Sequence, residues 1–131
     1  MRKFWLVSSL VCLIAPAALA QDPLKVGSKY YKLEFENSQV RVLRVRVGPH
    51  EKVPMRAHPA TVVVSLTDGH SKFTLPDGTV RETHGKAGQV IGSGAEKHAS
   101  ENLGDKPAEG IIIELKAKAA AAKPPAAKKK G

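Results

Sequence analysis

Apolar and polar residues alternate with a period of two along much of the chain between residues 30 and 116. The clearest example is QVRVLRVRV (39–47), in which valines and a leucine alternate with arginines and the phase slips at Val42-Leu43. A β-bulge at this slip would keep both apolar sets on the inner face of a sheet. The arginines are then predicted to form the solvated face of the strand, and the weaker alternation of YYKLEF (30–35) predicts a further strand.

Asp-Gly pairs separate several short apolar runs. Asp68-Gly69 lies between TVVVSLT and SKFTL, and Asp77-Gly78 lies between SKFTL and TVRETH. Both pairs are predicted to form hairpin turns, because Asp-Gly between apolar runs is a strong signal for a tight turn. Further strands are predicted at GQVIG (88–92) and GIIIELK (110–116).

The pattern contains no amphipathic helix of ordinary length, no internal repeat and no nucleotide-binding glycine loop. Many short strands joined by close turns are typical of a small antiparallel barrel or sandwich. The segment from residue 21 to residue 115 is long enough for one hydrophobic core and too short for two. The sequence therefore predicts an all-β fold with a single domain.

Residues 1–20 have the pattern of a secretory signal peptide. Arg2 and Lys3 precede an apolar run that ends in the triplet Ala18-Leu19-Ala20, so cleavage is predicted after that triplet. The run is shorter than the ~20 apolar residues that a membrane-spanning helix needs. Cleavage would also remove Cys12, the only cysteine, and leave a mature chain without a thiol or a disulfide. We therefore expect export to the periplasm or the cell exterior.

The formal net charge of +9 is concentrated at the two ends of the chain. Arg2 and Lys3 account for +2 and the lysines of residues 116–131 for +6, which leaves +1 for residues 21–115. An exported, nearly neutral domain is not expected to bind nucleic acid. Residues 116–131 are rich in Ala, Lys and Pro, and are predicted to form a disordered basic tail. The tail either serves solubility or contacts an anionic envelope surface through its lysines.

Residues 48 to 69 resemble the first signature segment of the cupins. That segment runs from a glycine through an H-x-H pair and a glutamate to a closing glycine. Gly48 and Gly69 match its ends and His58 matches the second histidine. Arg56 stands at the first histidine and Val62 at the glutamate.

GQVIGSGAEKHASEN (88–102) resembles the second cupin segment. Gly88, His98 and Asn102 match, whereas Gly94 and Glu96 replace the usual proline and glycine. The resemblance covers about residues 25 to 116. It implies a small single-domain cupin, a jelly-roll β-barrel with metal ligands on inward-facing strands and a tendency to form homodimers.

The divalent metal site that this resemblance implies is incomplete. Residues at i and i+2 of a strand share a face, so Arg56 is placed beside His58, and Val62 also faces inward if the strand continues regularly. Only His58 and His98 remain as metal ligands, which is fewer than catalytic metal sites normally use. The positive charge of Arg56 would also repel a cation.

Two other side chains are candidates for the site. Glu96 and His98 form E-x-H, so Glu96 supplies a replacement carboxylate unless it lies on the turn and points to water. His84 adds a third imidazole if its side chain enters the barrel.

Arg56 changes the chemistry that the barrel offers. Its planar donor fork suits a carboxylate or phosphate, unless it points outward or is neutralised by Glu51 or Glu96. The sequence favours a non-enzymatic protein that binds a small molecule in the barrel, and an anion is one class of ligand that Arg56 would suit. Its candidate ligand-binding residues are Arg56, His58, His98 and His84.

Two alternative functions stay open at this point. One is a metal-dependent cupin enzyme of the oxygenase or isomerase type. The other is an envelope-associated protein attached through the basic tail. The sequence identifies neither a ligand nor a substrate.

Overall fold

The computed structural model describes residues 21–117. The predicted signal peptide and residues 118–131 of the predicted tail lie outside the described residues. Within the described range, no helix is long and apolar enough to cross a membrane. A short helix, α2 (Pro23–Val26), precedes the strands. The strands are β1 (Tyr31–Glu36), β2 (Val40–Val47), β3 (Lys52–His58), β4 (Thr61–Ser65), β5 (Gly69–Thr74), β6 (Val80–Gly85), β7 (Val90–Ser93), β8 (Glu96–Asn102) and β9 (Ala108–Leu115).

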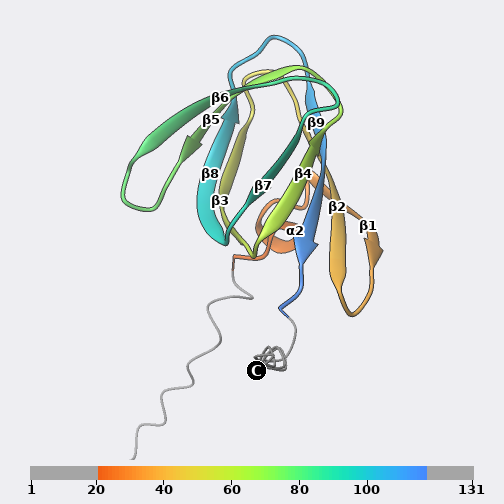
Figure 1. Ribbon diagram of the computed structural model, residues 1–131. Helices are drawn as coiled ribbons and strands as arrows, with labels where there is room; N and C mark the ends of the chain where they lie inside the picture. The colour runs from red at the N-terminus through yellow and green to blue at the C-terminus, as the bar shows by residue number, and fades with distance from the viewer. Residues whose placement is uncertain (1–20, 118–131) are drawn as a thin grey trace, which may run out of the picture.

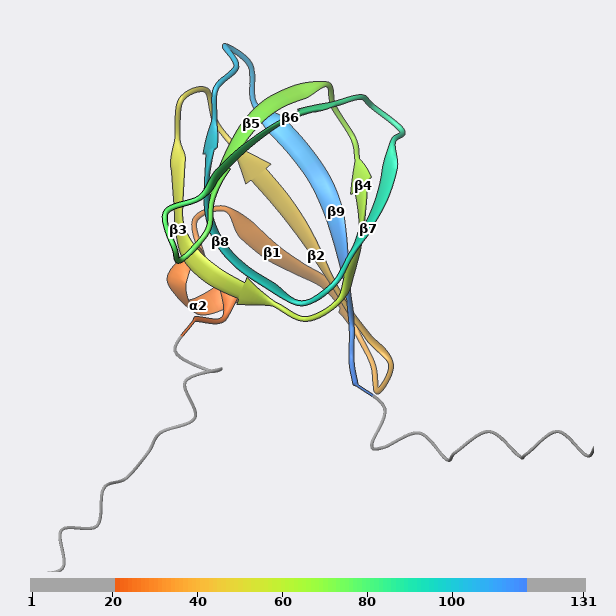
Figure 2. The ribbon, with the colours of Figure 1, turned by 60° about the vertical axis from the view of Figure 1, so that its left-hand side comes forward.

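The strands form two antiparallel sheets that curve toward one another into a barrel (Figures 1 and 2). One sheet has the order β1-β2-β9-β4-β7 and the other has the order β3-β8-β5-β6. The helix α2 packs against β3 and β1. Asp22 caps this helix, because its side chain accepts a hydrogen bond from the Leu24 amide at 2.9 Å. The predicted all-β antiparallel fold is confirmed.

The irregularity predicted at Val42-Leu43 occurs in the pairing of β1 with β2, but the extra residue lies on β1. Leu33 pairs with Leu43 and Phe35 pairs with Val42, which leaves Glu34 over. The pairing of β2 with β9 is continuous. Because β2 keeps its regular alternation, Val42 faces outward, and the prediction that both apolar sets face inward is wrong.

The arginines of β2 divide between the two faces of the sheet. Arg44 and Arg46 lie on the outer face and bind Glu109 at 2.9 and 3.1 Å, as the solvated-face interpretation predicts. Arg41 instead shares the inner face with Leu43, which is fully buried. The prediction that all three arginines are solvated is therefore wrong for Arg41.

Only one of the two predicted Asp-Gly hairpins forms. Asp77-Gly78 joins the paired strands β5 and β6, and Gly78 has a φ of 85° that only glycine adopts readily. Asp68-Gly69 instead lies where the chain passes from β4 in one sheet to β5 in the other. There the Asp68 carboxylate accepts hydrogen bonds from the Ala87 amide and from Lys86.

The hydrophobic core is a small cluster next to α2. Tyr31, Leu43, Val53 and Ile112 are buried, and Leu24 of the helix packs against them. The cluster joins both sheets, because Val53 comes from β3 and the other buried side chains come from the five-stranded sheet. Beyond it the two sheets enclose a cavity.

Candidate functional site

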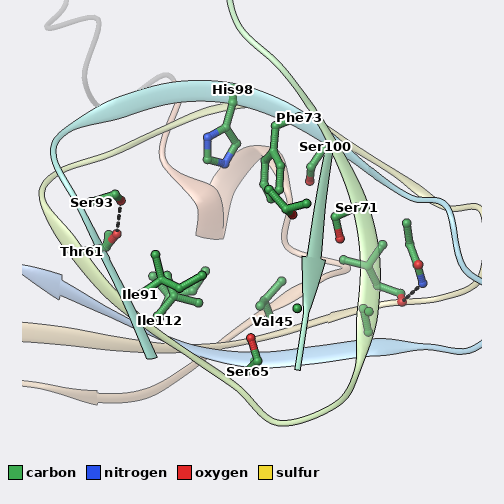
Figure 3. A pocket seen from close by; sticks show the side chains of 18 of the residues that line it. Val45, Thr61, Ser65, Ser71, Phe73, Ile91, Ser93, His98, Ser100 and Ile112 are labelled. Carbon is green, nitrogen blue, oxygen red and sulfur yellow. Dashed lines mark hydrogen bonds between the residues drawn. The ribbon is translucent and has the colours of Figure 1, made fainter. Parts of the chain in front are cut away.

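The cavity between the sheets has a volume of about 410 Å³, which is in the usual range for small-molecule sites. Its apolar wall includes Val45, Ile91 and Ile112 from the five-stranded sheet and Phe73 from the other sheet. Figure 3 shows these side chains around the interior, with His98 pointing inward from β8. A ligand here would therefore contact apolar side chains over most of its surface.

Arg56 is the buried cation of this cavity. It is 4% exposed and lines the cavity wall. Its guanidinium donates four hydrogen bonds to neutral oxygens, namely the Tyr31 hydroxyl (2.5 Å), the Ser100 hydroxyl (2.9 Å) and the carbonyls of Pro54 and His98 (both 3.3 Å). No carboxylate between residues 21 and 117 binds it directly. Arg56 is therefore a buried positive charge without a counter-ion among these residues. Such a charge is costly to bury.

The groups expected to neutralise Arg56 are engaged elsewhere. Glu51 binds Lys29 and accepts a hydrogen bond from the Gly48 amide at 2.8 Å. Burial raises the pKa of Tyr31, although the charge of Arg56 opposes this, so the Tyr31 hydroxyl stays protonated and is no counter-ion. The alternatives in which Arg56 points outward or pairs with Glu51 are therefore wrong.

His58 takes part in a buried chain of charged groups that leads away from the cavity. Its Nδ1 lies 2.8 Å from Oε1 of Glu114, which is 2% exposed. The other oxygen of Glu114 accepts from Arg41 Nε at 2.6 Å, and Arg41 donates to Asp22 at 2.6 Å. Burial alone would raise the pKa of Glu114, but hydrogen bonds from His58 and Arg41 outweigh burial and lower it. Glu114 is therefore an ionised carboxylate that orients the His58 ring.

His98 is held as a neutral imidazole with one fixed tautomer. Burial and the charge of Arg56 lower the pKa of His98 to about 4, although its hydrogen bond to Glu96 opposes the shift. Its Nδ1 lies 2.6 Å from Oε1 of Glu96, whose own pKa is lowered mainly by Arg81. An ionised carboxylate can only accept, so Nδ1 donates and Nε2 keeps its lone pair.

Glu96 lies on the inner face of β8, as the E-x-H spacing predicts. It accepts hydrogen bonds from both terminal nitrogens of Arg81 at 3.0 and 3.2 Å. The Arg81 guanidinium also lies over the Phe73 ring, 5.5 Å from its centre. The alternatives in which Glu96 points to water or neutralises Arg56 are therefore wrong, because Arg81 and His98 hold its carboxylate.

His84 does not join the other two imidazoles. It stands opposite His70 in the β5–β6 pair, and the two rings stack 4.1 Å apart with an angle of 16°. His58 and His98, in contrast, lie 5.4 Å apart between ring centres. The structure thus brings together Arg56, His58 and His98. His84 also lines the cavity, but it is exposed and its ring stacks on His70.

No protein-family model matches the sequence, and no curated protein matches it. Among solved structures, a cupin domain from Bordetella pertussis Tohama I is similar, with a TM-score of 0.62 and 24% identity over 66% of this chain and 92% of that one. The chain has the cupin fold. An RmlC-like cupin with a double-stranded β-helix from Methanocaldococcus jannaschii is also similar, with a TM-score of 0.53 and 13% identity over 65% of this chain and 77% of that one.

The polyketide cyclase RemF from Streptomyces resistomycificus is a further structural neighbour of this domain. Its TM-score is 0.50 and its identity is 16%, over 65% of this chain and 63% of that one. Cupin folds in this group thus include an enzyme as well as proteins described only by their fold. Since one fold supports many functions, the function of this cupin-fold domain must be argued from its own site.

The structure differs from the prediction at the position where the cupin motif has its glutamate. Thr61 and Val63 line the cavity, so the intervening Val62 faces outward, in register with Ile113. The regular strand that would turn Val62 inward is interrupted, because residues 59–60 separate β3 from β4. The prediction that Val62 faces inward is therefore wrong, but an aliphatic side chain, Val63, still occupies this part of the wall.

The donor groups of this site do not fit a divalent metal. Arg56 brings a positive charge to the first histidine position, and Glu96 is held by Arg81. In residues 21–117, no three His, Cys, Asp or Glu side chains are grouped so that they could hold a metal ion. His58 and His98 each use Nδ1 for a carboxylate, so two Nε2 atoms are the remaining donors. This is fewer than a catalytic metal site normally has.

The sequence interpretation missed Tyr31 and Ser100 at Arg56 and Glu114 at His58. Alternation within GIIIELK could have identified Glu114, because it shares a face with the core residue Ile112. Tyr31 and Ser100 carry no comparable signal, since their contacts with Arg56 depend on how the two sheets close.

Proposed function

We propose that this cupin domain binds a small carboxylate in its cavity and that Arg56 is the residue that recognises it. The observation that carries the proposal is the buried Arg56 charge, which has hydrogen-bond partners but no counter-ion among residues 21–117. Charged side chains are rarely buried without a partner of opposite charge. A ligand carboxylate would supply that charge.

The surroundings of Arg56 also suit an anion. A guanidinium carries more N–H donors than its four bonds here use. Tyr31 and Ser100 accept from Arg56 with their oxygens, which leaves their hydroxyl hydrogens available to donate. Three donors from three different strands can therefore converge on one carboxylate, in a cavity where charge-assisted hydrogen bonds are strong.

Calorimetric titration of the purified chain tests this function. We expect phenylacetate to bind, whereas its neutral analogue phenylacetamide should bind at least about tenfold more weakly because it lacks the charge that Arg56 attracts. The Arg56→Met variant should lose phenylacetate binding by a similar factor. Arg46→Met is the matched control, since Arg46 lies on the outer face and binds Glu109.

A stability measurement on the same variants separates ligand binding from a structural role. Removing a buried charge that has no counter-ion relieves its desolvation cost, which offsets the hydrogen bonds that Tyr31 and Ser100 lose in this variant. We therefore expect Arg56→Met to keep its free energy of unfolding within about 1 kcal/mol of the wild type, or to raise it. Equal binding of phenylacetate by wild type and Arg56→Met, or a loss of several kcal/mol in stability without any loss of binding, would contradict the proposal.

Export belongs to the same proposal, and its support is the signal-peptide pattern of residues 1–20. The residue after the predicted cleavage position is part of the folded domain, because the Gln21 carbonyl accepts a hydrogen bond from the Ala57 amide at 3.0 Å. We expect the protein to accumulate outside the cytoplasm with Gln21 as its first residue. Terminal sequencing of the cell fractions checks this, and a full-length chain confined to the cytoplasm would refute it. Attachment through residues 116–131 stays a prediction.

A further inference from the structure

The cavity offers a hydrogen-bond acceptor next to its cation. Arg56 and His98 stand directly opposite one another in the β3–β8 pair, and both side chains line the cavity. Opposed residues on one face of a sheet have their Cβ atoms only about 5 Å apart. A carboxylate bound to Arg56 therefore has His98 beside it, within the dimensions of a small ligand.

Only one nitrogen of His98 is available to a ligand. Nδ1 is engaged by Glu96 at 2.6 Å, and the carboxylate can only accept, so Nε2 carries the lone pair. No hydrogen bond from any residue in the described range 21–117 reaches Nε2. The Phe73 ring meets the imidazole edge to face at 5.0 Å and limits how far it can turn. A ligand in the cavity that carries a donor can therefore form a hydrogen bond with this acceptor.

We propose that the ligand is a hydroxy acid, whose carboxylate binds Arg56 and whose neighbouring hydroxyl donates to Nε2 of His98. The inference rests on the proposed carboxylate binding and adds the chemical class of ligand. A simple carboxylic acid would satisfy Arg56 but would place no donor at the Nε2 lone pair of His98. The apolar wall formed by Val45, Ile112 and Phe73 accommodates the remaining carbon body.

Mandelate and phenylacetate form a matched pair of probes, because they differ only by the hydroxyl on the carbon next to the carboxylate. Titration at neutral pH should show that mandelate binds the wild-type chain about tenfold more tightly, the gain expected from one buried hydrogen bond. In His98→Phe, mandelate should fall to the affinity of phenylacetate. In His98→Gln, whose side-chain oxygen can still accept, part of the preference should return.

The outcomes separate this inference from the function on which it rests. Equal affinity of mandelate and phenylacetate for the wild type would overturn the hydroxy-acid assignment while Arg56-dependent carboxylate binding stands. A preference for mandelate that persists unchanged in His98→Phe would also overturn it, because another residue would then accept the hydroxyl. Failure of both probes to bind, or binding that Arg56→Met leaves unchanged, would overturn the carboxylate function itself.

Discussion

Replacing Glu114 with alanine is expected to lower the free energy of unfolding by about 3–5 kcal/mol, the range found when one partner of a buried ion pair is removed. Glu114 is 2% exposed and binds both His58 and Arg41. Its removal would leave Arg41 with Asp22 as its only carboxylate partner within residues 21–117 and His58 with no carboxylate at all. Chemical denaturation of wild type and variant at neutral pH measures the difference.

Glu109→Ala is the matched control on the same strand. Like Glu114, Glu109 binds two basic side chains, Arg44 and Arg46. It differs in lying on the outer face of the sheet, where the side chains of Arg44 and Arg46 are 39% and 63% exposed. Exposed pairs of this kind contribute at most about 1 kcal/mol. Losses of similar size in Glu109→Ala and Glu114→Ala would show that the buried chain has no special role in stability.

A double-mutant cycle between Arg41 and Glu114 examines the same chain of charges more directly. Residues in one network of hydrogen bonds usually show coupling energies of about 0.5–3 kcal/mol. We expect a value near the upper end, because Arg41 and Glu114 are direct cross-strand partners at 2.6 Å. Additive single variants would contradict this expectation.

The strands of this protein could be predicted from the sequence because local chemistry determines them. Alternation along residues 39–47 predicted β2, and Asp77-Gly78 predicted the β5–β6 hairpin. Asp68-Gly69 has the same local signal but joins strands of different sheets. Sheet membership depends on pairing with distant strands, and no short stretch of sequence carries that information.

The candidate site was predictable where it depends on spacing within one strand. Arg56 and His58 share a face at i and i+2, as do Glu96 and His98. The inward direction of Val62 was wrong because it required the strand to continue across residues 59–60, where the connection between β3 and β4 changes the phase. The partners of each charge, such as Arg81 for Glu96, come from strands that are distant in sequence.

Stability should also fall on mild acidification because of His98. Its pKa is about 4 in the folded protein, whereas a histidine free of burial and neighbouring charges has a pKa of 6.5. Between these values the unfolded chain binds a proton that the folded chain does not, so lowering the pH favours unfolding. The loss begins as the pH falls below 6.5 and is complete near pH 4, with a total of about 3 kcal/mol.

The His98→Gln variant isolates this contribution. Glutamine keeps a donor for Glu96 but does not titrate, so the other histidines and the carboxylates contribute similarly to both proteins. Between pH 7 and pH 5 the wild type should lose about 2 kcal/mol more than the variant, as measured by denaturation at each pH. The direction follows because burial, and after it the charge of Arg56, disfavours the imidazolium of His98 more strongly than Glu96 favours it. If wild type and His98→Gln lost stability in parallel over this range, His98 would not be the neutral, buried imidazole on which the hydroxyl acceptor depends.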